Sequence, residues 1–114
     1  MPKRVARSYL PLTPATFQIL VALGDGEKHG YAILKDVRQW ASGEVRLSTG
    51  TLYGNLARLV DAGIIVESNR SPKIPSNEER RRYYRVTEFG REVAIAEAER
   101  MEQVLAMART RKLI

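Results

Sequence analysis

The stretch Leu47–Val66, LSTGTLYGNLARLVDAGIIV, predicts a helix, a glycine stop and the start of a strand. Ser48 suits the start of the helix, because its hydroxyl can accept a hydrogen bond from an unpaired backbone N–H in the first turn. Leucines recur from Leu52 to Leu59 at helical spacing and define one apolar face. Gly63 follows the last turn, where a left-handed residue ends a helix at low cost. The stretch therefore predicts an amphipathic helix that leads directly into a strand.

The face opposite the leucines is small, polar and lightly charged. It is expected to carry Thr51, Asn55 and Arg58, with Thr49 and Gly50 at its exposed start. Such a face suits the recognition helix of a helix-turn-helix, which lies in the major groove of DNA and reads base edges. The alternative is an ordinary amphipathic helix whose polar face is simply solvated.

Composition narrows the class of protein. The chain has 114 residues and a mass of 12.9 kDa, and 44% of its residues are apolar, which suits one domain with a small core. It has no cysteine and one histidine, His29, so we expect no disulfide, no metal and no cofactor. No apolar run is long enough to cross a bilayer, so we expect a cytoplasmic protein. A net charge of +6 favours a polyanionic partner.

Two further helices are expected before the opening stretch. Thr13 and Pro14 form a helix start signal, because proline lacks an N–H that the first turn would leave unpaired anyway. That helix is expected to end at Gly24, and a second helix is expected over residues 30–41. The apolar stripe of the second helix is Ile33, Leu34, Val37 and Trp40.

After Gly63 the apolar period changes to two, which predicts a strand to Asn69 and a partner strand over Arg80–Val86. From Arg70 to Arg85 there are six basic residues and two acidic ones, a net charge of +4 on one hairpin. Arginine cannot lose its proton here, and its forked donors match phosphate oxygens. The alternative is an edge hairpin that charge protects from aggregation.

The last predicted helix begins after Thr87 and runs to about Arg109. A seam with spacing of four and three runs along it, which is typical of a coiled coil. A helix of this length cannot bury its apolar surface on a small core alone, so we expect a two-fold dimer. The alternative is packing along the first helix of the same chain. The seam residues are Ala94, Ala98, Met101, Leu105 and Ala108.

Three helices followed by a basic hairpin is the element order of a winged helix-turn-helix. The expected fold is therefore mainly α with a small β-hairpin and one long C-terminal helix. Several motifs accompany this order: Leu12-Thr13, His29-Gly30-Tyr31, Gly50-Thr51-Leu52-Tyr53 with Leu56 and Arg58-Leu59, Gly63-Ile64-Ile65, and Arg82-Tyr83-Tyr84-Arg85-Val86-Thr87 with Gly90.

In that order, over about residues 12–91, these motifs resemble the PadR family of bacterial transcription regulators. The resemblance implies a winged helix-turn-helix that binds double-stranded operator DNA, usually as a homodimeric repressor and often released by a small-molecule effector. The chain looks like the short class with a single C-terminal helix. The expected organisation is a flexible basic arm over 1–11, a DNA-binding domain over 12–86 and a dimerisation helix over 87–114.

The winged helix-turn-helix arrangement predicts which residues contact DNA. Thr49, Thr51 and Asn55 are expected near base edges, and Ser48 is expected to pair with phosphate as well as cap the helix. Tyr53 is ambiguous, because its ring can pack while its hydroxyl reaches the DNA backbone. Arg58 either contacts DNA or pairs with a carboxylate of the protein. The expected phosphate ligands of the hairpin are Lys73, Arg80, Arg81 and Arg82.

Two other classes of function compete with a DNA-binding regulator. An enzyme is disfavoured, because the carboxylates are scattered and there is no glycine-rich phosphate loop or nucleophile elbow. A winged-helix module that binds a protein partner without specific DNA binding is the main alternative. Salt-dependent retention on DNA distinguishes a DNA-binding regulator from such a module, because phosphate binding releases counterions.

Overall fold

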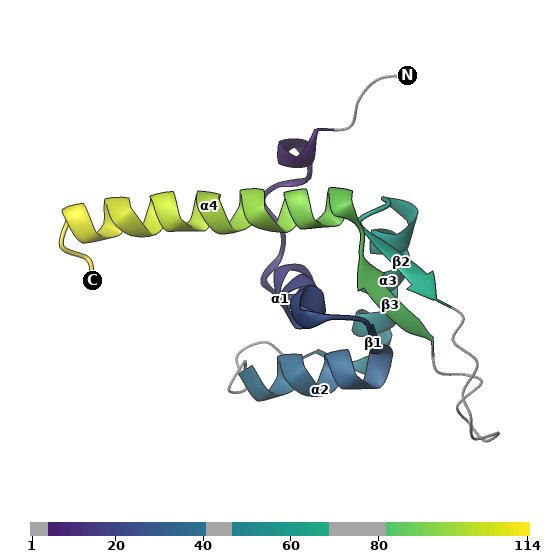
Figure 1. Ribbon diagram of the computed structural model, residues 1–114. Coiled ribbons are helices and arrows are strands. Elements are labelled where there is room, and N and C mark those ends of the chain that lie inside the picture. Colours follow the sequence, from purple (N-terminus) through teal and green to yellow (C-terminus); the bar gives the residue numbers. More distant parts are fainter. Residues whose placement is uncertain (1–4, 41–46, 69–81) are drawn as a thin grey trace.

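The computed structural model describes residues 5–40, 47–68 and 82–114 (Figure 1). The described helices and strands follow the order expected for a winged helix-turn-helix with a long C-terminal helix. They are η1 (Ala6–Tyr9), α1 (Pro14–Ala22), η2 (Leu23–Asp25), β1 (Lys28–His29), α2 (Gly30–Trp40), α3 (Thr49–Asp61), β2 (Ile65–Ser68), β3 (Tyr83–Val86) and α4 (Glu88–Thr110). The predicted fold class is therefore confirmed.

The predicted helix start and stop signals are confirmed. The side chain of Thr13 accepts a hydrogen bond from the Thr16 backbone N–H at 3.1 Å, with Pro14 in the first position of α1. Ser48 caps α3 in the same way, accepting from the Thr51 N–H at 3.1 Å. Gly63 has a φ of 75°, the left-handed conformation expected after the last turn of α3.

The sheet has one strand more than the sequence predicted. Its order is β1-β3-β2 and both pairings are antiparallel. Strand β1 contains only Lys28 and His29, which pair with Tyr84 and Tyr83. A strand of two residues is too short to display an apolar period, so the pattern gave no signal for it. The tip of the predicted hairpin lies outside the described residues.

The core lies where α1, α2, α3 and the sheet meet. The predicted leucine face of α3 is buried, as are three of the four residues of the stripe predicted for α2. The fourth residue of that stripe, Trp40, is 48% exposed at the end of α2. The main buried side chains are Ile19, Leu20, Leu23, Ile33, Val37, Leu52, Leu56, Leu59, Ile64 and Ile65.

The first half of α4 is docked on this core. Thr87 caps it by accepting from the Gly90 N–H at 2.9 Å and donates its hydroxyl proton towards the Gly63 carbonyl at 2.6 Å. Gly90 is needed here, because a Cβ at this position would lie 1.8 Å from the Ile64 carbonyl oxygen. The contact fixes the direction in which α4 leaves the sheet.

Residues 5–10, part of the basic arm predicted for 1–11, contact α4. The short helix η1 lies against α4 (Figure 1), and the ring of Tyr9 meets that of Phe89 edge to face at 5.5 Å between centroids. The Leu12 backbone N–H donates to the Glu97 carboxylate at 2.8 Å. The basic residues of this segment indicate a solvated arm and give no sign of these apolar contacts. Residues 1–4 lie outside the described part of the chain.

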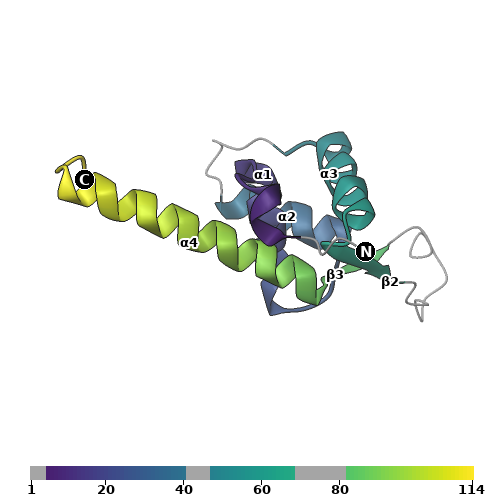
Figure 2. The same ribbon diagram turned by 90° about the horizontal axis from the view of Figure 1, so that it is seen from above.

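The second half of α4 extends beyond the body of the molecule (Figure 2). Its apolar side chains are exposed there, including Val104 at 49% and Met107 at 57%. Within the described residues, no helix is long and apolar enough to cross a membrane.

Candidate nucleic-acid interface

The start of α3 presents an exposed, hydroxyl-rich surface. Ser48, Thr49 and Thr51 are all exposed. The Ser48 hydroxyl also donates to the Thr51 hydroxyl at 2.9 Å, which orders the first turn. Hydroxyl groups both donate and accept hydrogen bonds, so this surface can meet phosphate oxygens and base edges alike.

Asn55 does not belong to that surface, and the prediction that it faces outward is wrong. Only 7% of the residue is exposed. Its amide nitrogen donates to the Thr51 carbonyl at 2.9 Å, and its amide oxygen accepts from the Thr16 hydroxyl at 2.7 Å. The reason is helical spacing: position 55 lies three residues after Leu52 and four before Leu59, on the buried face. Asn55 therefore connects α3 to α1, and Thr16 is its partner.

Tyr53 packs its ring on the start of α2. The residue is 44% exposed, and a Cβ added at Gly30 would lie 2.6 Å from its hydroxyl oxygen. Gly30 is therefore needed for the close approach of α2 and α3. The ring packing that the sequence suggested for Tyr53 is confirmed, and contact of its hydroxyl with DNA stays a prediction.

Arg58 is exposed on α3 and has no ion-pair partner among the described residues. The internal pairing considered for it is therefore not seen in that part of the chain. An exposed guanidinium one turn beyond the hydroxyl surface remains available to a phosphate.

One of the four hairpin cations predicted to bind phosphate lies in the described residues. Arg82 directs Nη1 to both oxygens of Glu67, at 3.3 and 3.4 Å. Glu67 was not predicted as a functional residue, although its alternation with the buried Ile65 placed it on the inward face of its strand. Lys73, Arg80 and Arg81 lie outside the described residues.

The seam predicted along α4 divides into two parts. Ala94 and Ala98 are half-buried against their own chain, and Ala94 packs on the core. Met101 and Leu105 are 45% and 42% exposed, and Ala108 lies beyond them on the projecting half. Packing along the same chain is therefore confirmed for the first half of the helix only, where α4 contacts α1.

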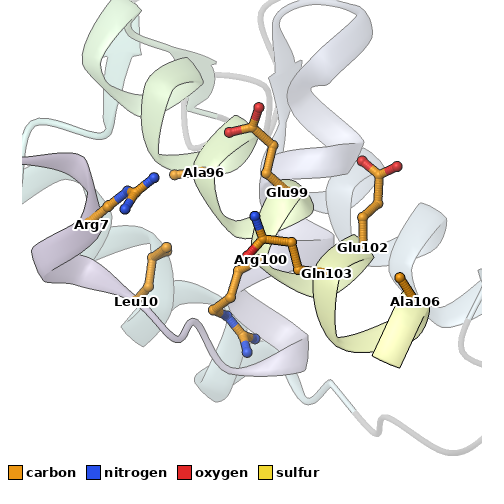
Figure 3. Close-up of a pocket in the computed structure, with 8 residues that line it drawn as sticks. All are labelled: Arg7, Leu10, Ala96, Glu99, Arg100, Glu102, Gln103 and Ala106. Carbon is orange, nitrogen blue, oxygen red and sulfur yellow. The ribbon is translucent and has the colours of Figure 1, made fainter. Parts of the chain in front are cut away.

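A polar groove of about 650 Å³ lies between η1 and the outer face of α4 (Figure 3). Figure 3 shows Arg7 and Leu10 on one side of it and Glu99, Arg100 and Glu102 on the α4 side. Its mixed charge gives it no preference for an anion. Among the described residues, no group of three or more acidic, histidine or cysteine side chains is arranged to hold a metal.

The PadR-like model of transcriptional regulators matches residues 19–96. This chain belongs to the PadR-like family. The match covers α2, α3, the sheet and the docked half of α4, so the predicted resemblance is confirmed. The family is one of transcriptional regulators, as expected, and not of enzymes.

One curated relative matches most of this chain. The chain is 38% identical over 90 residues to an uncharacterised 37.1 kDa protein in transposon TN4556 of Streptomyces fradiae. That match covers 79% of this chain but only 24% of the relative, so the chain spans about a quarter of its length.

Solved structures are similar as well. A transcriptional regulator from Clostridium thermocellum Cth-833 is 28% identical with a TM-score of 0.69, over 91% of this chain and 90% of that one. A PadR family transcription regulator from Clostridium difficile R20291 has a TM-score of 0.72 over 86% of this chain and 97% of that chain. Its identity is 22%, so it supports the fold alone.

Proposed function

We propose that this PadR-family chain is a homodimeric regulator that binds operator DNA and represses transcription by occupying it. The observation that carries the proposal is the exposed hydroxyl surface of Ser48, Thr49 and Thr51 at the start of α3. In a helix-turn-helix, this end of the recognition helix enters the major groove. Arg58 lies further along α3, and Arg82 lies on the neighbouring sheet, so cations flank the surface where a phosphate backbone runs.

The division of roles follows from the chemistry of each side chain. Thr49 and Thr51 read base edges, while Arg58 and Arg82 bind phosphates and set the register. Lys73, Arg80 and Arg81 add to the phosphate contacts. Asn55 is left out of this interface, because its amide is already engaged inside the protein.

The projecting half of α4 supports two-fold pairing. Residues 88–102 contain five glutamates and two arginines, whereas residues 103–114 contain three basic residues and no acidic one. In an antiparallel pair, the basic end of each helix lies beside the acidic stretch of the other. The exposed Met101 and Leu105 and the half-buried Ala108 then pack in the seam. Two recognition helices related in this way would fit successive major grooves about 34 Å apart.

A small-molecule effector is proposed to bind at this paired surface. Methionine side chains are unbranched and adaptable, so Met101 and Met107 can repack around an apolar ligand. Such a ligand would change the angle between the two α4 helices and hence the spacing of the recognition helices.

Titration of labelled double-stranded DNA at increasing salt concentrations tests the proposal. Phosphate binding releases counterions, so the logarithm of the affinity should fall linearly with the logarithm of salt concentration. The alternative function is a winged-helix module that binds a protein partner. That module would show no such dependence and no preference among DNA sequences, and a reporter gene would then be unaffected by the protein.

A further inference from the structure

A cleft separates the recognition helix from the sheet. It has a volume of about 390 Å³, and we refer to it as the α3–sheet cleft. Its lining residues come from α3 on one side and from β2 and β3 on the other. They are Tyr53, Ala57, Val60, Asp61, Glu67, Arg82 and Tyr84.

Glu67 projects into this cleft from the sheet. It lies directly opposite Tyr84 in the β2–β3 ladder, and directly paired residues point to the same face of a sheet. Tyr84 is buried and packs on the core, so that face is the inner one. Arg82, which lies just before β3, lines the same cleft. A carboxylate and a guanidinium thus meet at the mouth of the cleft.

The ion pair between them is loose. Arginine–carboxylate hydrogen bonds are usually about 2.7–2.9 Å long and often bidentate. Here one nitrogen, Nη1, lies 3.3 and 3.4 Å from the two oxygens. The Arg82 side chain is 64% exposed, so water and salt weaken the attraction further. A second anion of higher charge density can therefore take Arg82 away from Glu67.

We propose that Glu67 is an affinity-limiting residue, which holds Arg82 in the α3–sheet cleft until a DNA phosphate displaces it. This inference rests on the proposed DNA-binding function. On random DNA, the paired Arg82 adds almost no net positive charge to loose electrostatic binding. On an operator, base contacts hold α3 in place and bring a backbone phosphate within reach of Arg82. Breaking the ion pair costs the same free energy on either duplex, so Glu67 weakens binding to both, and binding to the operator by at least as much.

The test compares Glu67→Gln with the wild type on two labelled duplexes: an operator selected from a random pool, and a random-sequence duplex of equal length. Affinity for the random duplex should rise about threefold to tenfold, because a freed arginine gains one phosphate contact. The salt slope on that duplex should steepen by about 0.9, the value for one phosphate. Operator affinity should rise at least as much, because the variant has no ion pair to break when Arg82 turns to the phosphate.

Two further variants separate this mechanism from a general loss of negative charge. Asp61→Asn removes one carboxylate from the same cleft, on the α3 side, and Asp61 has no ion pair with an arginine among the described residues. It should change affinity for either duplex by less than about twofold, because it frees no arginine. In an Arg82→Gln background, Glu67→Gln should no longer tighten binding to random DNA, because the two changes act through one pair.

The outcomes are distinct. Equal effects of Glu67→Gln and Asp61→Asn, or a full effect of Glu67→Gln without Arg82, would show that bulk charge alone acts and would overturn the role of Glu67. A wild-type protein that selects an operator but whose Glu67→Gln variant binds random DNA no better would overturn it as well. A wild-type protein that binds no duplex at low salt would refute the proposed function itself. Thermal unfolding of each variant confirms that the compared proteins are folded.

Discussion

Asn55 holds the recognition helix against α1 through its side-chain amide. Removing that amide breaks its two hydrogen bonds, to the half-buried Thr16 hydroxyl and to the Thr51 carbonyl, which together are worth about 1–3 kcal/mol. Asn55→Ala should therefore lower the free energy of unfolding by that amount, measured by urea denaturation.

Thr49→Ala is the matched control, because Thr49 is exposed on the same helix. It should change stability by less than about 0.5 kcal/mol and reduce preference for the operator. If Asn55→Ala left stability intact and abolished sequence preference instead, the structural role assigned to Asn55 would be wrong.

Gly90 sets the contact between α4 and the sheet. Because a Cβ there would lie 1.8 Å from the Ile64 carbonyl oxygen, Gly90→Ala must push α4 away from β2. We expect a loss of about 2–4 kcal/mol in the free energy of unfolding, by thermal or urea denaturation.

Gly50→Ala provides the comparison, since nothing lies within 4 Å of a Cβ at that position of α3. Alanine is the better helix former, so this variant should be as stable as the wild type or more stable by up to about 1 kcal/mol. Equal destabilisation by both changes would contradict the close contact at Gly90.

At the scale of elements, Glu97 fastens the segment before α1 to α4. It is 1% exposed and accepts hydrogen bonds from the Arg100 Nε and from the Leu12 backbone N–H. The bond from Arg100 is the main cause that lowers the pKa of this carboxyl below its ordinary value of 4.5, and burial opposes it. Because the folded-state pKa is lowered, the stability that Glu97 contributes is present above about pH 4.5 and is lost as the pH falls through the folded-state pKa.

The measurement is the melting temperature as a function of pH, for the wild type and for Glu97→Gln. The variant should melt at a lower temperature near neutral pH, and the difference from the wild type should shrink on acidification below about pH 4.5. Glu99→Gln removes an exposed carboxylate from the same helix and should follow the wild-type curve. A constant difference between Glu97→Gln and the wild type at all pH values would refute the ionised role of Glu97.

The elements differ in how far the sequence predicts them, for local reasons. The starts of α1, α3 and α4 were predictable, since Thr13, Ser48 and Thr87 each cap their own helix through contacts three residues away. Strand β1 was not predictable, because its two residues become a strand only by pairing with β3. The same holds for Asn55: its partner Thr16 lies 39 residues earlier, and no local pattern reports such a contact.

At the scale of the whole molecule, the docked and projecting halves of α4 have different tasks. The docked half completes the core, and the projecting half leaves apolar side chains exposed (Figure 2). Leu105→Glu should therefore disrupt the proposed dimer without unfolding the monomer, because a charge in the apolar seam must be desolvated on pairing. Light scattering should show a monomer, and operator affinity should fall sharply.

Gln103→Glu adds the same charge on the groove side of α4, away from the seam. It should remain dimeric. Two variants with the same oligomeric state would show that the seam does not join the protomers.

The account depends on one geometric claim: the hydroxyl surface at the start of α3, doubled by two-fold symmetry, reads a DNA duplex. The most direct measurement is selection of bound duplexes from a random pool by the wild type and by a variant carrying Thr49→Ala and Thr51→Ala. The wild type should enrich a two-fold symmetric sequence with half-sites centred about 10 base pairs apart, and the variant should lose that enrichment while retaining salt-dependent binding. Enrichment of the same symmetric sequence by both proteins, or of none by the wild type, would contradict the claim.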